Sequence, residues 1–162
     1  MTALRALLTL VLLSLAMPAL AQGTNVSFGT IRQDPNAEVE VTADNLSVDQ
    51  ATGTAVFSGN VVIGQGEMRL SAARVLVVYK GSGNGIDRLE ATGGVTLVSG
   101  PDAAEAERAD YNIDRGTIEM SGNVLLTQGP SALTADRMSV DLNDGSARMS
   151  GRVKTILQTG NN

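Results

Sequence analysis

The 162-residue sequence contains no cysteine, no histidine and no tryptophan, and only two phenylalanines and two tyrosines. Without cysteine, disulfides and thiol chemistry are excluded. Without cysteine and histidine, the usual nucleophile–base pairs and zinc sites are also missing. The net charge is −5 and the basic residues form no block, so the chain lacks the positive footprint that nucleic-acid binding needs. We therefore expect no catalytic residue, no metal, no cofactor and no nucleic-acid partner.

Residues 1–21 have the composition of a secretory signal peptide. Arg5 precedes an apolar run at 6–15, and Ala19-Leu20-Ala21 forms a small-x-small cleavage site before Gln22. The run is shorter than the about 20 residues that a membrane span needs. We predict export with cleavage after residue 21; a retained N-terminal anchor is the alternative.

One stretch of the sequence, 58–72, recurs at 121–135 with an offset of 63 residues and no gap. The two copies share the letters S-G-N-V, then Q-G, then L-[ST]-A. A shorter motif, [ST]-G-x-V, starts at 58, 92, 121 and 150, and an alanine motif between its copies starts at 43, 72, 106 and 135. A unit of about 30 residues, long enough for two short strands and their turns, is therefore repeated about four times.

Apolar and polar residues alternate with a period of two through most of these units, which predicts half-buried β-strands. Turn signals such as Asn143-Asp144-Gly145 separate them. In the alternating pattern, the motif glycines stand at the positions that apolar residues otherwise occupy. We therefore predict that each glycine marks a bend or a bulge of its strand. The pattern predicts an all-β fold of about a dozen or more short strands, a twisted antiparallel β-jelly roll or V-shaped slot built from about four β-hairpin repeats. We place this domain at 38–158, after an N-terminal arm at 22–37 that is flexible or forms one short strand, and before a polar tail at 159–162.

The inward positions of the predicted strands are mostly Val, Leu, Ile and Met, which make a smooth and adaptable lining. A dry core and a lipid-binding slot both fit this composition. The lining that we predict consists of Val48, Phe57, Val61, Ile63, Leu70, Val75, Val77, Leu97, Tyr111, Ile113, Met120, Leu126, Met138 and Val140.

Two columns of charged residues recur in the alanine motif. The acidic column holds Asp44, Glu107 and Asp136. Because these carboxylates repeat with the fold, strand ends or a solvated rim explain them better than a catalytic or metal site. The basic column holds Arg74, Arg108 and Arg137, which we expect to face outward. A solvated ladder paired with acids is one interpretation of these arginines, and contact with a lipid phosphate is the other.

The S-G-N-V strand, the Q-G turn, the run L-[ST]-A-D-R-M-S-V-D at 133–141 and the run L-E-A-T-G-G-V at 89–95 together resemble the OstA-like domain, most closely its LptA family. The likeness covers roughly 39–157. It implies a twisted β-jelly roll with an apolar groove for the acyl chains of lipopolysaccharide, located in the periplasm. It also implies head-to-tail self-association and contact with an LptC-like inner-membrane partner and an LptD-like outer-membrane partner. Energy would come from an ATPase complex elsewhere, so no catalytic residue is needed.

Open sheet edges would supply these contacts, and we expect them at 39–48 and 153–157. Three other functions remain open on the sequence. The chain could be a structural β-repeat module of the cell envelope with a dry core. It could be an LptC-like anchored partner if the N-terminus is retained, or a hydrolase that depends on a carboxylate.

Overall fold

The computed structural model describes residues 24–27, 37–81, 83 and 85–156. They form one 11-stranded antiparallel sheet, in the order β1-β10-β9-β8-β7-β6-β5-β4-β2, with β3 also paired to β4 and β11 to β9. The strands are β1 Thr24–Ser27, β2 Glu40–Thr42, β3 Asn45–Asp49, β4 Thr54–Gln65, β5 Met68–Tyr79, β6 Ile86–Ser99, β7 Asp102–Asn112, β8 Thr117–Gln128, β9 Ser131–Asp141, β10 Ser146–Ser150 and β11 Lys154–Ile156. Within these ranges, no helix is long and apolar enough to cross a membrane.

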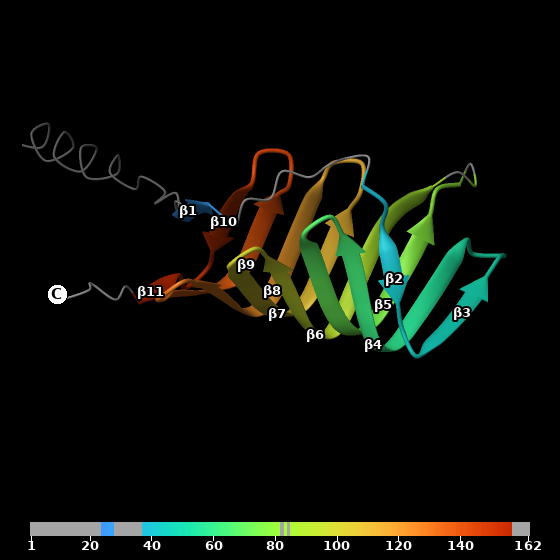
Figure 1. Cartoon of the computed structure of the whole chain (residues 1–162), viewed down its shortest axis with the longest axis horizontal. Helices are drawn as coiled ribbons and strands as arrows, with labels where there is room; N and C mark the ends of the chain where they lie inside the picture. Colours follow the sequence, from blue (N-terminus) through green and yellow to red (C-terminus); the bar gives the residue numbers. More distant parts are fainter. Residues whose placement is uncertain (1–23, 28–36, 82, 84, 157–162) are drawn as a thin grey trace, which may run out of the picture.

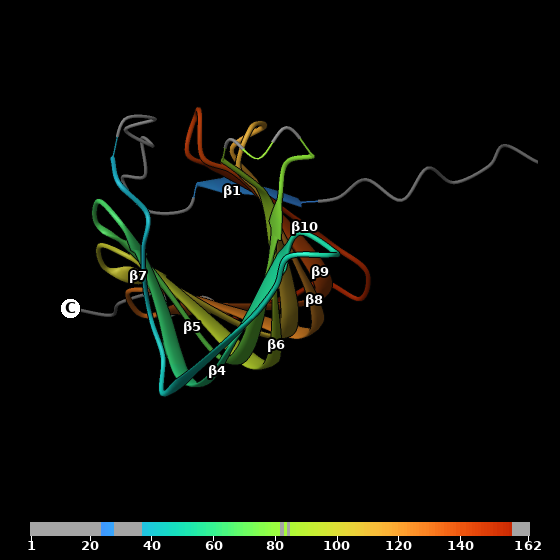
Figure 2. The same ribbon diagram turned by 90° about the vertical axis from the view of Figure 1, so that its right-hand side faces the viewer.

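Each long strand crosses from one side of a V to the other. Figure 1 shows the strands side by side along the long axis, and Figure 2 shows the V from its end, open at the top. We call the two sides half-sheets. Half-sheet 1 contains β1, β3, β10, the first halves of β4, β6 and β8, and the second halves of β5, β7 and β9. Half-sheet 2 contains β2, β11 and the other halves.

The repeated glycine motif produces the bend. At the first three copies the pairing register shifts, for example between Ser121 and Val124 on β8. Gly122 and Asn123 both have positive φ there, +84° and +48°, a backbone region that Gly and Asn adopt more readily than other residues. The result is a β-bulge that turns the strand from one half-sheet into the other. At the fourth copy β10 ends at Ser150 and β11 begins at Lys154.

The predicted fold class is confirmed. Strands β4 and β8 have the same bounds when shifted by the 63-residue repeat. The strand lengths differ from the prediction of a dozen or more short strands. Six of the eleven strands in the described residues reach 11–14 residues, because most of them continue through the bend.

The predicted N-terminal arm contains β1, which pairs with β10 and so takes the short-strand alternative. Val26 of this arm packs against the core, as do Val39 and Val41 at the start of the predicted domain. The predicted signal peptide at 1–21 and the tail at 159–162 lie outside the described residues.

Candidate functional site

The inner face of half-sheet 1 carries continuous apolar rows across neighbouring strands. One row consists of Val77, Leu89, Tyr111, Ile118 and Val140, which are directly paired from β5 to β9. Because directly opposed residues of adjacent strands point to the same side, these side chains form a ladder along the V. The neighbouring row ends in three methionines, Met120, Met138 and Met149.

Half-sheet 2 presents a matching ladder from the other side. Its central row pairs Ile63, Leu70, Leu97, Ala104, Leu126 and Leu133 from β4 to β9. The two ladders together form one cluster of buried residues. Burial of each such Val, Leu, Ile or Met contributes about 1.5–3 kcal/mol, so this seam between the half-sheets is the main source of stability.

Eleven of the fourteen predicted lining residues lie in this seam with at most 2% of their surface exposed. Phe57 and Ile113 are half-buried and pack against it. Val48 shares the inward face because it pairs with Ala55, but it is 60% exposed. The reason is that β3 is an edge strand that pairs only with β4. In the described chain, no further strand lies beside it to cover Val48.

Several seam residues were missed by the sequence prediction. They are Met68, Leu89, Val124, Ile118, Leu133, Leu142 and Met149, all buried. The same period-two alternation marks them, so the signal was present in the sequence.

A polar row lies along the inner rim of half-sheet 2, at the ends of its hairpins. Gln65, Ser99 and Asp102 are buried there. The amide of Gln128 donates a 2.8 Å hydrogen bond to Oδ2 of Asp102. The hydroxyl of Tyr111, from half-sheet 1, donates a 2.7 Å bond to Oε1 of Gln65. This row was also missed, although the repeated Q-G pair contains two of its members.

The arginine column faces outward, as predicted. Arg74, Arg108 and Arg137 are exposed and lie in one row of half-sheet 1, with Thr92 and Ser121 between them. Arg108 bridges Asp110 at 2.8 Å and Glu90 at 3.1 Å. These contacts, above all the hydrogen bonds to Asp110, raise the pKa of the Arg108 guanidinium. The solvated ladder therefore describes Arg108; within the described residues, Arg74 and Arg137 have no ion pair.

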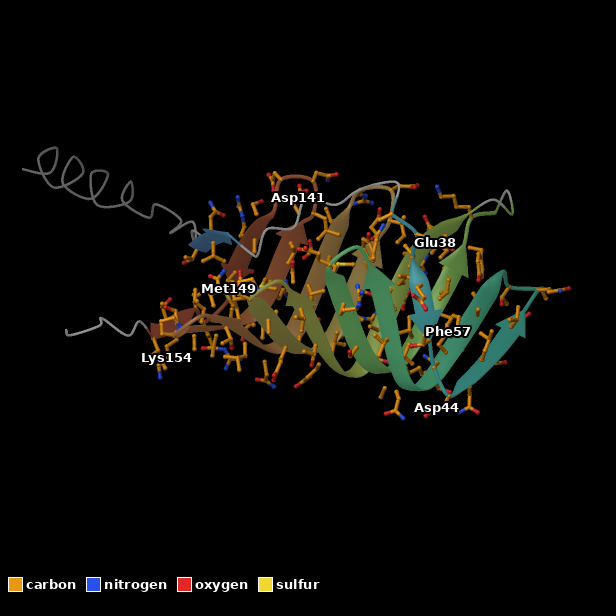
Figure 3. All side chains as sticks on the ribbon, viewed as in Figure 1. Glu38, Asp44, Phe57, Asp141, Met149 and Lys154 are labelled. Atoms are coloured by element: carbon orange, nitrogen blue, oxygen red, sulfur yellow. The ribbon has the colours of Figure 1, made fainter. Side chains whose placement is uncertain are left out.

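The acidic column has a structural role on the convex side of the bend, where Figure 3 labels Asp44. Its carboxylates accept hydrogen bonds from the second residue of a glycine bulge, as in the 2.9 Å bond from Asn60 to Asp44. Hydrogen bonding to Arg152 lowers the pKa of Asp136. In the part of the chain that the structure describes, no group of three or more acidic side chains could hold a metal ion.

The two ends of the sheet expose strand edges, of which β2, β3 and β11 lie in the regions that the sequence predicted and β1 does not. At one end are β2 and β3, which carries Leu46 at 57% and Val48 at 60% exposure. At the other end are β11, which carries Ile156 at 54% exposure, and β1, which covers β10. The sheet is thus open at both ends of a closed apolar seam.

The sequence and the fold are similar to those of known proteins. The family model described as LptA/(LptD N-terminal domain) LPS transport protein matches residues 40–146. An uncharacterized protein of Rhizobium meliloti (strain 1021) is 31% identical over 111 residues, which are 64% of this chain and 60% of that protein's length. LptH, the LptA homologous periplasmic component of the lipopolysaccharide transport device from Pseudomonas aeruginosa, has a similar structure, with a TM-score of 0.69. That match has 16% sequence identity and covers 78% of this chain and 99% of the LptH chain.

Proposed function

Because the chain belongs to the LptA/(LptD N-terminal domain) family of LPS transport proteins, we propose that it carries lipopolysaccharide through the periplasm, with the lipid's acyl chains held between the two half-sheets. Membership in a family of transport proteins also confirms the expectation that the chain is not an enzyme. The observation that carries the proposal is the apolar seam, which runs without interruption from β4 to β9.

The physical basis for binding is the aliphatic character of the seam. Each CH₂ group of an acyl chain that leaves water for such surroundings gains about 0.8 kcal/mol. The chain has few aromatic residues and six methionines, and Met120, Met138 and Met149 sit together in the seam. Flexible, unbranched Met side chains repack around a guest more readily than rigid rings do. The acidic net charge gives no attraction toward an anionic head group, so acyl contact supplies the affinity.

The open ends support the second part of the proposal, a bridge between membranes. Strand addition at β2 and β3 of one copy and at β11 and β1 of the next would continue the sheet and extend the seam. Such a head-to-tail contact is heterologous and builds filaments. The same edges would receive the related domains of an LptC-like inner-membrane partner and an LptD-like outer-membrane partner.

A structural module with a dry core is the second candidate, and the closed seam favours it. The seam side chains are almost inaccessible to water, so a lipid enters only if the half-sheets part. The LptC-like alternative depends on residues 1–21, and the mass of the protein purified from cells decides whether they are removed.

Photo-crosslinking in living cells tests the carrier proposal. A photoreactive residue replaces Val77, which is buried in half-sheet 1, or Val61, which is buried in half-sheet 2. Arg74 is the matched control, since it lies on the outer face of the same strand as Val77. Lipopolysaccharide attached at Val77 and Val61 but not at Arg74 supports the carrier. Attachment at none of them, in folded protein, eliminates it and leaves the structural module.

A further inference from the structure

The V bends at four equivalent corners. At each corner, two consecutive residues of positive φ lie opposite one residue of the preceding strand or segment. The positive-φ pairs are 59–60, 93–94, 122–123 and 151–152, and the opposed residues are Asp44, Ala73, Glu107 and Asp136.

Three of the corners are held by a side-chain clamp. The amide of Asn60 donates to Oδ2 of Asp44 at 2.9 Å. The amide of Asn123 donates to Oε1 of Glu107 at 2.6 Å. At the third corner, the Arg152 guanidinium donates to Oδ1 of Asp136 at 2.6 Å and 2.9 Å. Each clamp connects the glycine corner to the preceding strand or segment by a polar bond on the convex surface.

The β6 corner lacks both halves of the clamp. Its positive-φ pair is Gly93 and Gly94, at +86° and +84°, and the opposed residue is Ala73. Two consecutive glycines have more conformational freedom than the Gly-Asn and Gly-Arg pairs elsewhere. A Cβ atom built on Gly94 would meet nothing within 4 Å.

A surface cleft lies at the β6 corner, where the side chains of a clamp are missing. It has a volume of ≈ 450 Å³ and is lined by residues that include Asn60, Ala73 and Gly94. The cleft at the corresponding repeat positions further along the chain is lined by residues that include Asn123, Asp136 and Arg152, and its volume is ≈ 290 Å³. The Asp136–Arg152 pair occupies the place that Ala73 and Gly94 leave open.

We infer that the β6 corner is the hinge of the V, the position about which the two half-sheets move apart. The register shifts against both neighbouring strands at the β6 corner and equally at the β8 corner. The two corners therefore differ in the missing clamp and in the second glycine, not in their bulges. Residues that absorb φ/ψ changes at the ends of rigid elements are what a hinge requires. This inference rests on the proposed function in one respect. If the protein carries lipid, opening at this corner is the way by which the lipid enters the closed seam.

Amide hydrogen exchange of the purified protein tests the hinge directly. The matched comparison is the β8 corner, because β6 and β8 both have long strands on either side. We expect amides at 93–96 to exchange at least tenfold faster than those at 122–125. Equal or slower exchange at 93–96 overturns the inference, whatever the protein binds.

Two double variants exchange the side chains of the β6 and β8 corners. Ala73→Asp with Gly94→Asn installs a clamp, and the existing clamps show that an acidic side chain fits opposite the first glycine. Glu107→Ala with Asn123→Gly removes one. We expect the first variant to slow exchange at 93–96 to the rate at 122–125, and the second to speed exchange at 122–125 to the rate at 93–96. Circular dichroism and the thermal transition establish that each variant is folded; rates that stay unchanged in both folded variants contradict the hinge.

Binding of purified lipopolysaccharide separates the hinge from the carrier function. In a stopped-flow assay, the Ala73→Asp/Gly94→Asn variant should take up lipopolysaccharide several-fold more slowly than the unmodified protein. Uptake at an unchanged rate, together with the slowed exchange, refutes the hinge as the entry route. If the unmodified protein binds no lipopolysaccharide, the carrier proposal fails while the exchange contrast still decides whether the hinge exists.

Discussion

The hydroxyl of Tyr111 in half-sheet 1 donates a 2.7 Å hydrogen bond to Oε1 of Gln65 in half-sheet 2. Both residues are buried, and the Gln65 amide in turn donates to the carbonyl of Ala37 at 3.3 Å. In the described residues, the half-sheets also share the long strands that pass through the bend and the apolar cluster between them. Apolar contacts have no preferred direction. A polar bond across the V therefore fixes the spacing of the half-sheets at this point.

Removal of this bond is the first prediction. Tyr111→Phe should lower the free energy of unfolding by about 1–2 kcal/mol, the usual effect of deleting one partner of a buried hydrogen bond. Tyr79→Phe is the matched control, because Tyr79 is 40% exposed at the end of β5, and it should change stability by less than about 0.5 kcal/mol. Urea unfolding measures both variants, and equal effects would show that the cross-V bond contributes nothing.

The same tyrosine gives the protein a specific alkaline sensitivity. Burial raises the pKa of Tyr111 to about 12 from its ordinary value of 10.0. The unfolded chain therefore loses this proton at lower pH than the folded protein does. The stability that Tyr111 contributes is fully present below pH 10 and is lost as the pH rises from about 10 to about 12, a change on the order of 2 kcal/mol.

The pH prediction is measured as a difference between two proteins. Urea unfolding of the unmodified protein and of Tyr111→Phe at pH 9, 10 and 11 removes the contributions of all other titrating groups that they share. The stability difference should shrink above pH 10. A constant difference across this range would mean that the Tyr111 hydroxyl does not titrate differently in the folded state.

The glycine corners predict a contrast between two alanine substitutions. Gly122→Ala forces a residue with a side chain to φ +84° and places its Cβ 2.6 Å from Oε2 of Glu107. Gly129→Ala, at φ +53°, meets nothing within 4 Å. We expect Gly122→Ala to cost about 2–3 kcal/mol and Gly129→Ala about 1 kcal/mol. Thermal or urea unfolding measures the contrast, and similar costs would show that Glu107 simply moves aside.

Much of this structure could be predicted from the sequence because its signals are local and repeated. The 63-residue repeat and the period-two alternation identified the sheet, and eleven of the fourteen chosen lining residues are buried. Val48 is exposed although it follows the same alternation, because it lies on an edge strand. Alternation shows which face a residue is on, but it does not show whether another strand lies beside its own. The bend or bulge predicted at each motif glycine is confirmed in β4, β6 and β8. The strands were nevertheless expected to be shorter than they are, since a bulge and a strand end have the same local composition.

The polar features could not be predicted because they depend on contacts between distant residues. Tyr111 and Gln65 are 46 positions apart and meet only when the V closes. The clamps join residues 16 positions apart, such as Asn60 and Asp44, and neither residue type alone indicates a bond. Each member stands in a repeat column, however, so comparison of the columns with one another contains the clue: where the acid becomes Ala73, the partner becomes Gly94.

The last prediction concerns the ends of the sheet. Lys is unfavourable at an edge that receives another strand, so Val48→Lys in β3 and Ile156→Lys in β11 should each abolish filament growth in sedimentation velocity runs. Val98→Lys is the control, since Val98 has 37% exposure on β6, away from both ends. A head-to-tail contact joins unlike ends, so a mixture of the Val48→Lys and Ile156→Lys proteins retains one good pair of ends and should form dimers, while each protein alone stays monomeric. Dimers of either variant alone would instead indicate a symmetric contact between like ends, which closes on itself and could not build a bridge.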